Sequence, residues 1–300
     1  MLKIIAEVGS VHDGSFGNAL CLIEAVAKAG AWAIKFQHHI AEEETTDYAP
    51  NPTYFKGESR KDYFNRISFT KKEWELLYNK AKSCSLKFIV SPFSVKSLIE
   101  LKETGVDIIK IASGEVTNTE LLRAIKLAEV DVIMSSGMST IEELEIARNI
   151  LGDSLLSLMQ CTSEYPCKPE NVGLNNISIL GNKFQLKRGF SDHTIGSVAS
   201  ILAVGEGAEY IEKHVTFSQS MYGSDAKHSM EIADFPSFVE DLKVGYEIVN
   251  SNQDKDKSAE LLKPMKETFE KSYVYAKDLG IGHTIEKSDL ALKKPGNGLS

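Results

Sequence analysis

Polar and charged side chains recur at the ends of the apolar segments of this 300-residue sequence. The segment DIIKIASGE shows the pattern: Lys110 stands between Ile109 and Ile111, and Ser113 and Glu115 follow shortly after. Because side chains alternate between the two faces of a strand, Lys110 lies on the face opposite the two isoleucines. A lysine in that position indicates either a binding site or an edge strand with one solvated face.

Several other apolar segments also end in polar residues. If these segments are the parallel strands of a barrel, their carboxyl ends meet at one rim, where such folds carry their chemistry. Burying many polar groups is costly unless they are paired or bind a ligand. We therefore predict a functional site at that rim. Its residues are Glu7, Lys35, Gln37, Ser91, Lys110, Ser113, Glu115, Ser135, Ser136, Thr162, Asp192, His193, Glu212 and His214.

The chemistry of part of this set favours a small polyanion as the ligand. Lys35 and Lys110 end the second and fourth strands and can neutralise its charge. The four serines of the set can donate hydrogen bonds to its oxygens. A phosphorylated carboxylic acid would match both features.

A second part of the set favours a metal. His193 and His214 end the seventh and eighth strands, and Glu7 ends the first, which is next to the eighth in a closed barrel. Two imidazoles and a carboxylate suit a divalent transition metal that acts as a Lewis acid.

Strand-like and helix-like segments alternate eight times along the first 250 residues. This alternation predicts an α/β fold with a parallel sheet, and eight repeats predict a closed (β/α)8 TIM barrel over an open doubly wound sheet. The first loop, GSVHDG, does not match the dinucleotide-binding pattern GxGxxG. The predicted strands are 2–8, 31–37, 87–91, 107–111, 131–137, 154–160, 188–194 and 209–216. The predicted helices are 18–28, 71–84, 95–103, 119–129, 141–151, 169–180, 196–205 and 235–249.

The sequence predicts three regions. Residues 1–250 form the barrel, with a long insertion at 38–68 that we expect to be a functional loop over the site. Residues 251–272 are predicted to be a polar linker. Residues 273–300 are predicted to begin a small β-rich module.

Composition limits the class of partner and the location. The 34 basic and 42 acidic residues give a net charge of −8, which argues against nucleic acid as a partner. No apolar run approaches the roughly 18 residues needed to span a membrane, and the start lacks a signal-peptide pattern. We therefore expect no membrane association and a cytoplasmic location. The four cysteines show no CxxC spacing, so we expect reduced, mostly buried thiols without a chemical role.

Eight motifs resemble those of the sialic acid (nonulosonate) synthases. In order they are AEVG at 6–9, IKFQ at 34–37, SPFS at 91–94, KIASGE at 110–115, SSGM at 135–138, CTSEYP at 161–166, SDHT at 191–194 and EKHVT at 212–216. In that family a barrel precedes a small antifreeze-like (SAF) domain. The resemblance implies condensation of phosphoenolpyruvate with an N-acetylmannosamine-like sugar, which gives a nine-carbon 2-keto acid and phosphate.

The resemblance also implies a role for each matching residue. The phosphoenolpyruvate-binding set is Lys35, Ser91, Lys110, Ser113 and Ser135 or Ser136, with Lys110 also counted as catalytic. The residues that hold the sugar are Gln37, Tyr165 and Asp225. The metal ligands are His193 and His214, with Mn²⁺ the usual ion and Mg²⁺ or Co²⁺ as alternatives. The acid-base and water-positioning carboxylates are Glu7 and Glu115.

Some positions depart from the family pattern. Ser163 replaces an asparagine of the sixth loop, where it would affect a phosphate or carboxylate contact. Lys294, in KKPGNG, replaces an arginine that reaches the sugar site of the partner subunit in a domain-swapped homodimer. We expect the same dimer here, built through the C-terminal module. Because a SAF domain needs about 60 residues, we expect residues 273–300 to be a partial module.

Two other functions fit part of the pattern. A Schiff-base aldolase or lyase would use Lys110 as its covalent lysine and would need no metal. A catalytically inactive sugar-binding homologue would need none of this chemistry. For a synthase, three sugars fit: N-acetylmannosamine, its 6-phosphate, or a diacetamido-trideoxy hexose of the legionaminic or pseudaminic type.

Overall fold

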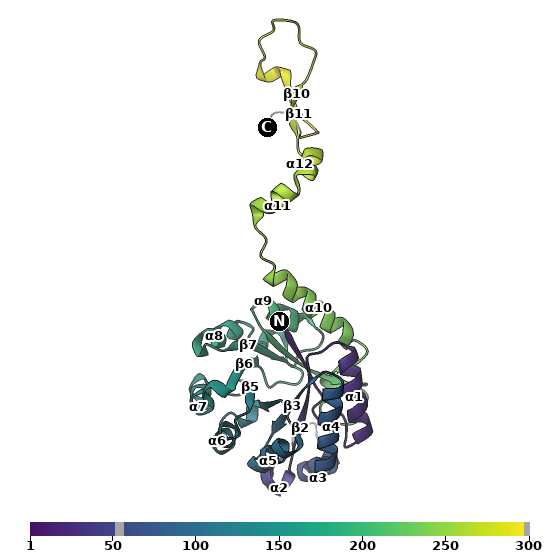
Figure 1. Cartoon of the computed structure of the whole chain (residues 1–300), viewed down its shortest axis with the longest axis vertical. Coiled ribbons are helices and arrows are strands. Elements are labelled where there is room, and N and C mark those ends of the chain that lie inside the picture. Colours follow the sequence, from purple (N-terminus) through teal and green to yellow (C-terminus); the bar gives the residue numbers. More distant parts are fainter. Residues whose placement is uncertain (52–56, 297–300) are drawn as a thin grey trace. The chain divides into compact units, whose positions relative to one another are not determined.

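Eight parallel strands form a closed barrel in the computed structural model, which describes residues 1–51 and 57–296. Each strand pairs with the next, and β1 also pairs with β8, so the sheet has no open edge at this point (Figure 1). The structure confirms the predicted TIM barrel. The strands are β1 (Lys3–Glu7), β2 (Ala33–His38), β3 (Lys87–Pro92), β4 (Ile108–Ile111), β5 (Asp131–Ser135), β6 (Leu155–Cys161), β7 (Lys187–Asp192) and β8 (Tyr210–Thr216). A two-residue strand, β9 (Met230–Glu231), continues the sheet beside β8.

Helices surround the barrel, and all but the last of them return the chain from one barrel strand to the next. They are α1 (Phe16–Lys28), α4 (Lys71–Ser83), α5 (Val95–Thr104), α6 (Thr119–Leu127), α7 (Ile141–Leu151), α8 (Asn175–Phe184), α9 (Val198–Gly205) and α10 (Phe235–Asn250). Side-chain caps define several starts, and the capping box predicted for Thr70 and Glu73 is present. Among the described residues, no helix combines the length and the apolar character needed to cross a membrane.

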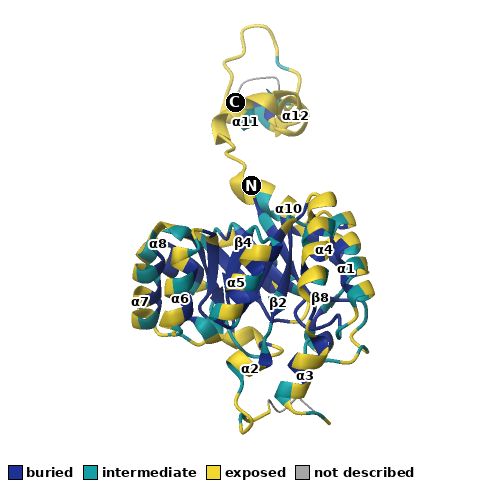
Figure 2. Cartoon of the chain, turned by 60° about the horizontal axis from the view of Figure 1, so that its bottom comes forward, coloured by how far each residue is buried: buried dark blue, intermediate teal, exposed yellow. Residues whose placement is uncertain are grey.

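Two apolar layers hold the barrel together. The larger lies between the outer face of the strands and the inner faces of the helices, and Figure 2 shows the buried strands inside a ring of helices exposed on their outer sides. The smaller fills the barrel interior. Its residues are Ile5, Ala33, Ile89, Ile108, Ile133, Met159 and Tyr210.

The inner layer places the polar residues above it. Side chains two positions apart on a strand share a face, so Glu7 follows Ile5, Lys35 follows Ala33, and Lys110 follows Ile108 into the barrel. β4 pairs with strands on both sides, and Lys110 is only 2% exposed. The edge-strand interpretation of Lys110 is therefore wrong.

The insertion after β2 is partly helical, which the prediction of a long loop missed. It contains α2 (Ala41–Glu44) and α3 (Arg60–Ile67), and its residues 52–56 lie outside the described part of the chain. Ser59 caps α3 by accepting from the backbone N–H of Asp62. Tyr63, Phe64 and Ile67 pack with Ala41 in a small apolar cluster of their own. Both helices lie at the end of the barrel opposite the N-terminus, where the strands finish (Figure 2).

The chain divides into two compact units, residues 1–249 and 250–300. In the second, strand β10 (Ser272–Tyr275) pairs antiparallel with β11 (Leu290–Lys293), in line with a small β-rich module. The region predicted to be a linker instead contains α11 (Lys255–Leu261) and α12 (Lys263–Phe269). Asp254 explains the first of them, because its side chain caps the free N–H groups of α11. Residues 297–300 of the predicted module lie outside the described residues.

The cysteines are free, and two of the four are buried. Cys161 and Cys167 are buried, Cys84 is half-buried, and Cys21 is exposed on the outer face of α1. The expectation of mostly buried thiols was therefore wrong for Cys21.

A substitution at Gly105, directly after α5, tests how closely the end of this helix packs against α4. Gly105 has a φ of +106°, and an added Cβ would lie 2.7 Å from the ring of Tyr78 on α4. We expect Gly105→Ala to lower the free energy of unfolding by about 1–3 kcal/mol, measured by urea denaturation. In Gly245→Ala, within α10, the new Cβ meets no atom within 4 Å. This control should be neutral or stabilising by up to about 1 kcal/mol. A Gly105 variant as stable as the Gly245 variant would contradict the argument.

Candidate functional site

A cavity of about 410 Å³ opens at the carboxyl end of the barrel strands. Its size is typical of a small-molecule site. Twelve of the predicted site residues line it. They are Glu7, Lys35, Gln37, Lys110, Ser113, Ser135, Ser163, Tyr165, His193, Glu212, His214 and Asp225.

Six predicted site residues do not line the cavity. The hydroxyl of Thr162 donates to the backbone carbonyl of Asn171, and Asp192 pairs with Lys213. Ser91 is buried at the end of β3, paired in register with Gln37. The hydroxyl of Ser136 donates to the backbone carbonyl of Met159. Glu115 ends a 3-10 turn, η1 (Ser113–Glu115), and its carboxylate accepts from the side-chain amide of Asn118. Lys294 belongs to the second unit, where its ammonium nitrogen lies 5.1 Å from the ring centroid of Phe269.

Four buried charges form the centre of the site. Glu212 receives hydrogen bonds from Lys110 at 3.0 and 3.1 Å and lies 3.4 Å from the Nζ of Lys35. Lys35 also lies 3.1 Å from Glu7, and the hydroxyl of Ser191 donates to Glu212 at 3.1 Å. All four ionisable side chains are at most 4% exposed. Two lysines and two carboxylates therefore balance in charge inside the barrel.

Burial and pairing shift the pKa values of these groups in different directions. Burial tends to raise the pKa of Glu212, but Lys110 and Lys35 outweigh it and hold that pKa well below its usual range. Burial also opposes the charge of Lys35, yet Glu212 and Glu7 raise its pKa. For Glu7, burial dominates and raises the pKa. For Lys110, burial dominates and lowers it. Glu212 is thus held as an anion, whereas Glu7 is the carboxyl that can exchange a proton.

Several polar atoms around this centre have no hydrogen-bond partner. The buried hydroxyls of Ser91 and Ser135, the Oε2 of Glu7 and the Nδ1 of His214 make no hydrogen bond among the described residues. Buried polar groups are nearly always paired in folded proteins, so unpaired ones require an explanation. A polar ligand in the cavity would supply the missing partners.

The two predicted metal ligands lie together on the cavity wall. The rings of His193 and His214 are 5.6 Å apart, and the Nδ1 of His193 lies 2.8 Å from the carbonyl oxygen of Thr162. That contact fixes one ring nitrogen and leaves the other for a ligand. Burial lowers the pKa of His214 to about 4, so its ring is neutral at pH 7, as metal coordination requires. Burial opposes protonation of His193, but Cys161 outweighs it and raises the pKa of this ring. The two imidazoles are placed to hold a metal when both are neutral.

Glu7 is not grouped with the two histidines as a third metal ligand, because its carboxylate has other partners. Its Oε1 accepts from Gln37 at 2.6 Å and pairs with Lys35. Among residues 1–51 and 57–296, no three His, Cys, Asp or Glu side chains are grouped as metal ligands. The remaining coordination positions would fall to substrate or water.

Asp225 is held beside the histidines by the first loop. Its Oδ2 accepts from the backbone N–H and the hydroxyl of Ser10, each at 2.8 Å. Gly9 has a φ of +53°, and a Cβ there would collide with this carboxylate. A glycine is thus required for the loop to approach Asp225 so closely.

Sequence reasoning missed some residues of the site. Glu212 was placed at the rim without a role, and Cys161, which lines the cavity, was assigned no chemistry. Arg60 and Phe64 come from the insertion, and Phe93 follows β3. The spacing from Glu212 to His214 could have shown the inward direction of Glu212. No comparable signal exists for Arg60, because it lies 22 positions beyond the end of β2 at His38.

Comparisons with known proteins identify the family of this chain. The model of the NeuB family matches residues 22–254. The chain is 33% identical to an N,N'-diacetyllegionaminic acid synthase of Legionella pneumophila, over 99% of this chain and 86% of that protein. It is 29% identical to a pseudaminic acid synthase of Helicobacter pylori, over 99% of this chain and 89% of that protein.

A solved structure shows the same architecture. It is the N-acetylneuraminic acid (sialic acid) synthetase from Leptospira borgpetersenii in complex with citrate, at 32% sequence identity and a TM-score of 0.77. The match covers 88% of this chain and 91% of that chain.

The central ion pair gives a test of the charge balance. Lys110→Met leaves Glu212 buried with one partner fewer, so we expect a loss of about 3–5 kcal/mol in the free energy of unfolding. Adding Glu212→Gln should recover most of that loss. As a control, Lys87→Met removes a half-exposed lysine 3.7 Å from Asp107 and should cost less than about 1 kcal/mol. Equal costs for Lys110→Met and Lys87→Met, measured by urea denaturation, would contradict the argument.

Proposed function

Because this chain belongs to the NeuB family, we propose that it is a nonulosonate (sialic acid-type) synthase. It condenses phosphoenolpyruvate with an N-acetylmannosamine-like sugar to a nine-carbon 2-keto acid and releases phosphate. The observation that carries this proposal is the set of two buried lysines beside buried hydroxyls that lack partners.

Phosphoenolpyruvate is assigned to the side of the cavity with the lysines. Lys35 and Lys110 face its charges, and the unpartnered hydroxyl of Ser135 can donate to one of its oxygens. Ser113 lies nearby, where its hydroxyl accepts from the backbone N–H of Gly137. Since Glu7 and Glu212 already balance the lysines, a bound polyanion must share them with these carboxylates.

The sugar is assigned to the side formed by Gln37, Tyr165 and Asp225. We propose a diacetamido-trideoxy hexose of the legionaminic type as the substrate. The name of the Legionella pneumophila relative supports this choice. So do Phe64, Phe93 and Met138, because apolar lining suits a methyl group better than a hydroxyl or a phosphate.

A divalent metal, most simply Mn²⁺, is assigned to His193 and His214, with Mg²⁺ or Co²⁺ as alternatives. When bound, it would act as a Lewis acid toward the sugar aldehyde. Glu7 is assigned proton transfer, because burial raises its pKa and it lines the cavity. Glu115 is assigned to water positioning only, since it lies outside the cavity lining.

The Schiff-base reaction has one observation in its favour. Burial lowers the pKa of Lys110, which makes the amine a better nucleophile. Borohydride should then trap substrate on Lys110. The synthase proposal expects no trapping, because both Nζ contacts to Glu212 hold Lys110 as a cation.

The assembly and location are also proposals. We propose a homodimer joined through the C-terminal unit, with Lys294 supplied to the sugar site of the partner. In that unit Leu261, Phe269 and Ile281 are largely exposed, as expected of a surface that another chain covers. A cytoplasmic location is supported by the four free cysteines.

The sugar assignment is tested by phosphate release from phosphoenolpyruvate. We expect turnover with 2,4-diacetamido-2,4,6-trideoxymannose and at least about tenfold lower kcat/KM with N-acetylmannosamine or its 6-phosphate. Preference for the 6-phosphate would overturn the sugar assignment. No phosphate release with any of the three would favour the inactive homologue.

The metal assignment is tested by chelation. Removing divalent ions should abolish phosphate release, and Mn²⁺ should restore it. A tenfold or greater loss of Mn²⁺ affinity is expected in His193→Ala and His214→Ala, measured by titration calorimetry without substrate. Full activity in a metal-free sample would contradict the assignment.

A further inference from the structure

A histidine without an assigned role extends the hydrogen bonding of the cavity into the insertion. The Nε2 of Gln37 donates to the Oε1 of Glu7 at 2.6 Å, and the Oε1 of Gln37 lies 3.1 Å from the Nε2 of His39. The other ring nitrogen of His39 lies 2.9 Å from the Oε2 of Glu44. These side chains form one continuous chain of hydrogen bonds from β1 to α2.

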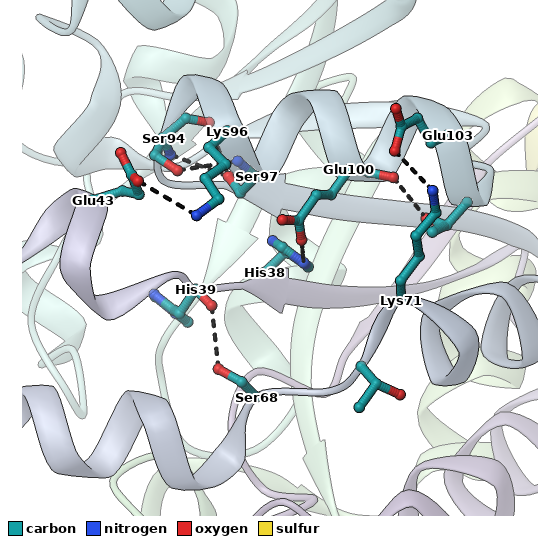
Figure 3. Close-up of polar contacts among 12 residues, drawn as sticks. His38, His39, Glu43, Ser68, Lys71, Ser94, Lys96, Ser97, Glu100 and Glu103 are labelled. Carbon is teal, nitrogen blue, oxygen red and sulfur yellow. Dashed lines mark hydrogen bonds and ion pairs between the residues drawn. The ribbon is translucent and has the colours of Figure 1, made fainter.

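Strand alternation explains why His39 joins this chain and its neighbour His38 does not. Gln37 and His39 are two positions apart and share a face, whereas His38 faces outward. The Nε2 of His38 lies 3.3 Å from the Oε2 of Glu100 on α5, and its ring is 4.9 Å from that of Trp74. Figure 3 shows His38 directed at Glu100 and the ring of His39 directed away from it. The same substitution can therefore be compared at two neighbouring histidines that have different surroundings.

Aromatic rings stack on both faces of the His39 ring. Its centroid lies 3.9 Å from that of Phe64 on α3 and 4.1 Å from that of Phe93 after β3, with interplanar angles of 18° and 17°. The side chains of His39 and Glu44 are only 7% and 6% exposed. Because both faces are covered, only the ring edge can form hydrogen bonds, and its two nitrogens point at Gln37 and Glu44.

The hydrogen-bonding partners of Gln37 determine which end of its amide faces Glu7 and which end faces His39. The Oε1 of Glu7 also accepts from Lys35, so the amide nitrogen of Gln37 must face it and the amide oxygen must face His39. The carboxylate of Glu44 likewise accepts, so both ring nitrogens of His39 act as donors. A donor at the Nε2 of His39 stabilises this orientation. Without it the amide oxygen loses its partner, and the side chain is free to turn away from Glu7.

We propose that His39, anchored by Glu44, is a positioning residue that sets the orientation of the Gln37 amide in the sugar side of the cavity. The inference rests on the proposed function, in which Gln37 contacts the sugar. Because Phe64 and Glu44 belong to the two helices of the insertion, His39 links the insertion to Gln37, in addition to the direct contribution of Arg60 and Phe64 to the cavity lining.

Two substitutions at His39 separate hydrogen bonding from packing. His39→Phe keeps an aromatic ring between Phe64 and Phe93 but removes the donor. His39→Gln loses the stacking but places an amide N–H near the former Nε2. The control is His38→Phe, the same change at the neighbouring position. KM for the sugar and for phosphoenolpyruvate would be measured for each variant, together with its Tm.

We expect His39→Phe to raise the KM for the sugar about fivefold to tenfold, the size of one lost hydrogen bond, with the KM for phosphoenolpyruvate within twofold of the parent. His39→Gln and His38→Phe should both stay within twofold for the sugar. An unchanged sugar KM in His39→Phe, a parallel rise in both KM values, or a His39→Gln variant as impaired as His39→Phe would overturn the proposal.

A crystal structure of His39→Phe gives a readout that needs no turnover. The Gln37 amide should move out of hydrogen-bond distance of the Glu7 carboxylate, and an unmoved amide would also overturn the proposal. If the parent protein releases no phosphate with any sugar, the proposed function fails. A displaced Gln37 amide in the variant would still support the positioning role of His39.

Discussion

The carboxylate of Glu212, held between Lys110 and Lys35, is the interaction on which the interior of the barrel depends. Two lysines almost fully removed from water would not remain charged without a counter-charge. Glu212 is 3% exposed and contacts both of them, while Glu7 adds the second negative charge beside Lys35. The barrel thus keeps two lysines charged next to the cavity because two carboxylates balance them.

The apolar layer beneath these charges strengthens the ion pairs and forms the bottom of the cavity. Ile5, Ile108, Tyr210 and their neighbours exclude water from the lower half of the barrel, which lowers the effective dielectric around the lysines. Burial raises the pKa of Glu7, whereas Lys110 and Lys35 outweigh burial and lower that of Glu212, so two carboxylates in one cluster have different tasks. One provides charge, and the other can exchange a proton.

The insertion after β2 connects the outer part of the site to this centre. Its helices supply Phe64 and Glu44, which hold the ring of His39, and His39 continues the hydrogen bonds of Gln37 and Glu7. The insertion is therefore joined to the central charges by direct hydrogen bonds. If Gln37 holds the sugar as proposed, sequence changes in the insertion can alter sugar binding without contact to the lysines.

The sequence by itself determined the barrel and the inward-facing polar residues, because strand alternation is a local pattern and a regular strand–helix repeat implies parallel pairing. It identified Lys35, Lys110, His193 and His214 as cavity residues for that reason. Only the tertiary structure decided which partner each group takes: Glu7 joins Lys35 and Gln37, and His39 stacks between Phe64 and Phe93. These contacts join segments separated by tens of residues and depend on side-chain packing, which no periodicity along the chain encodes.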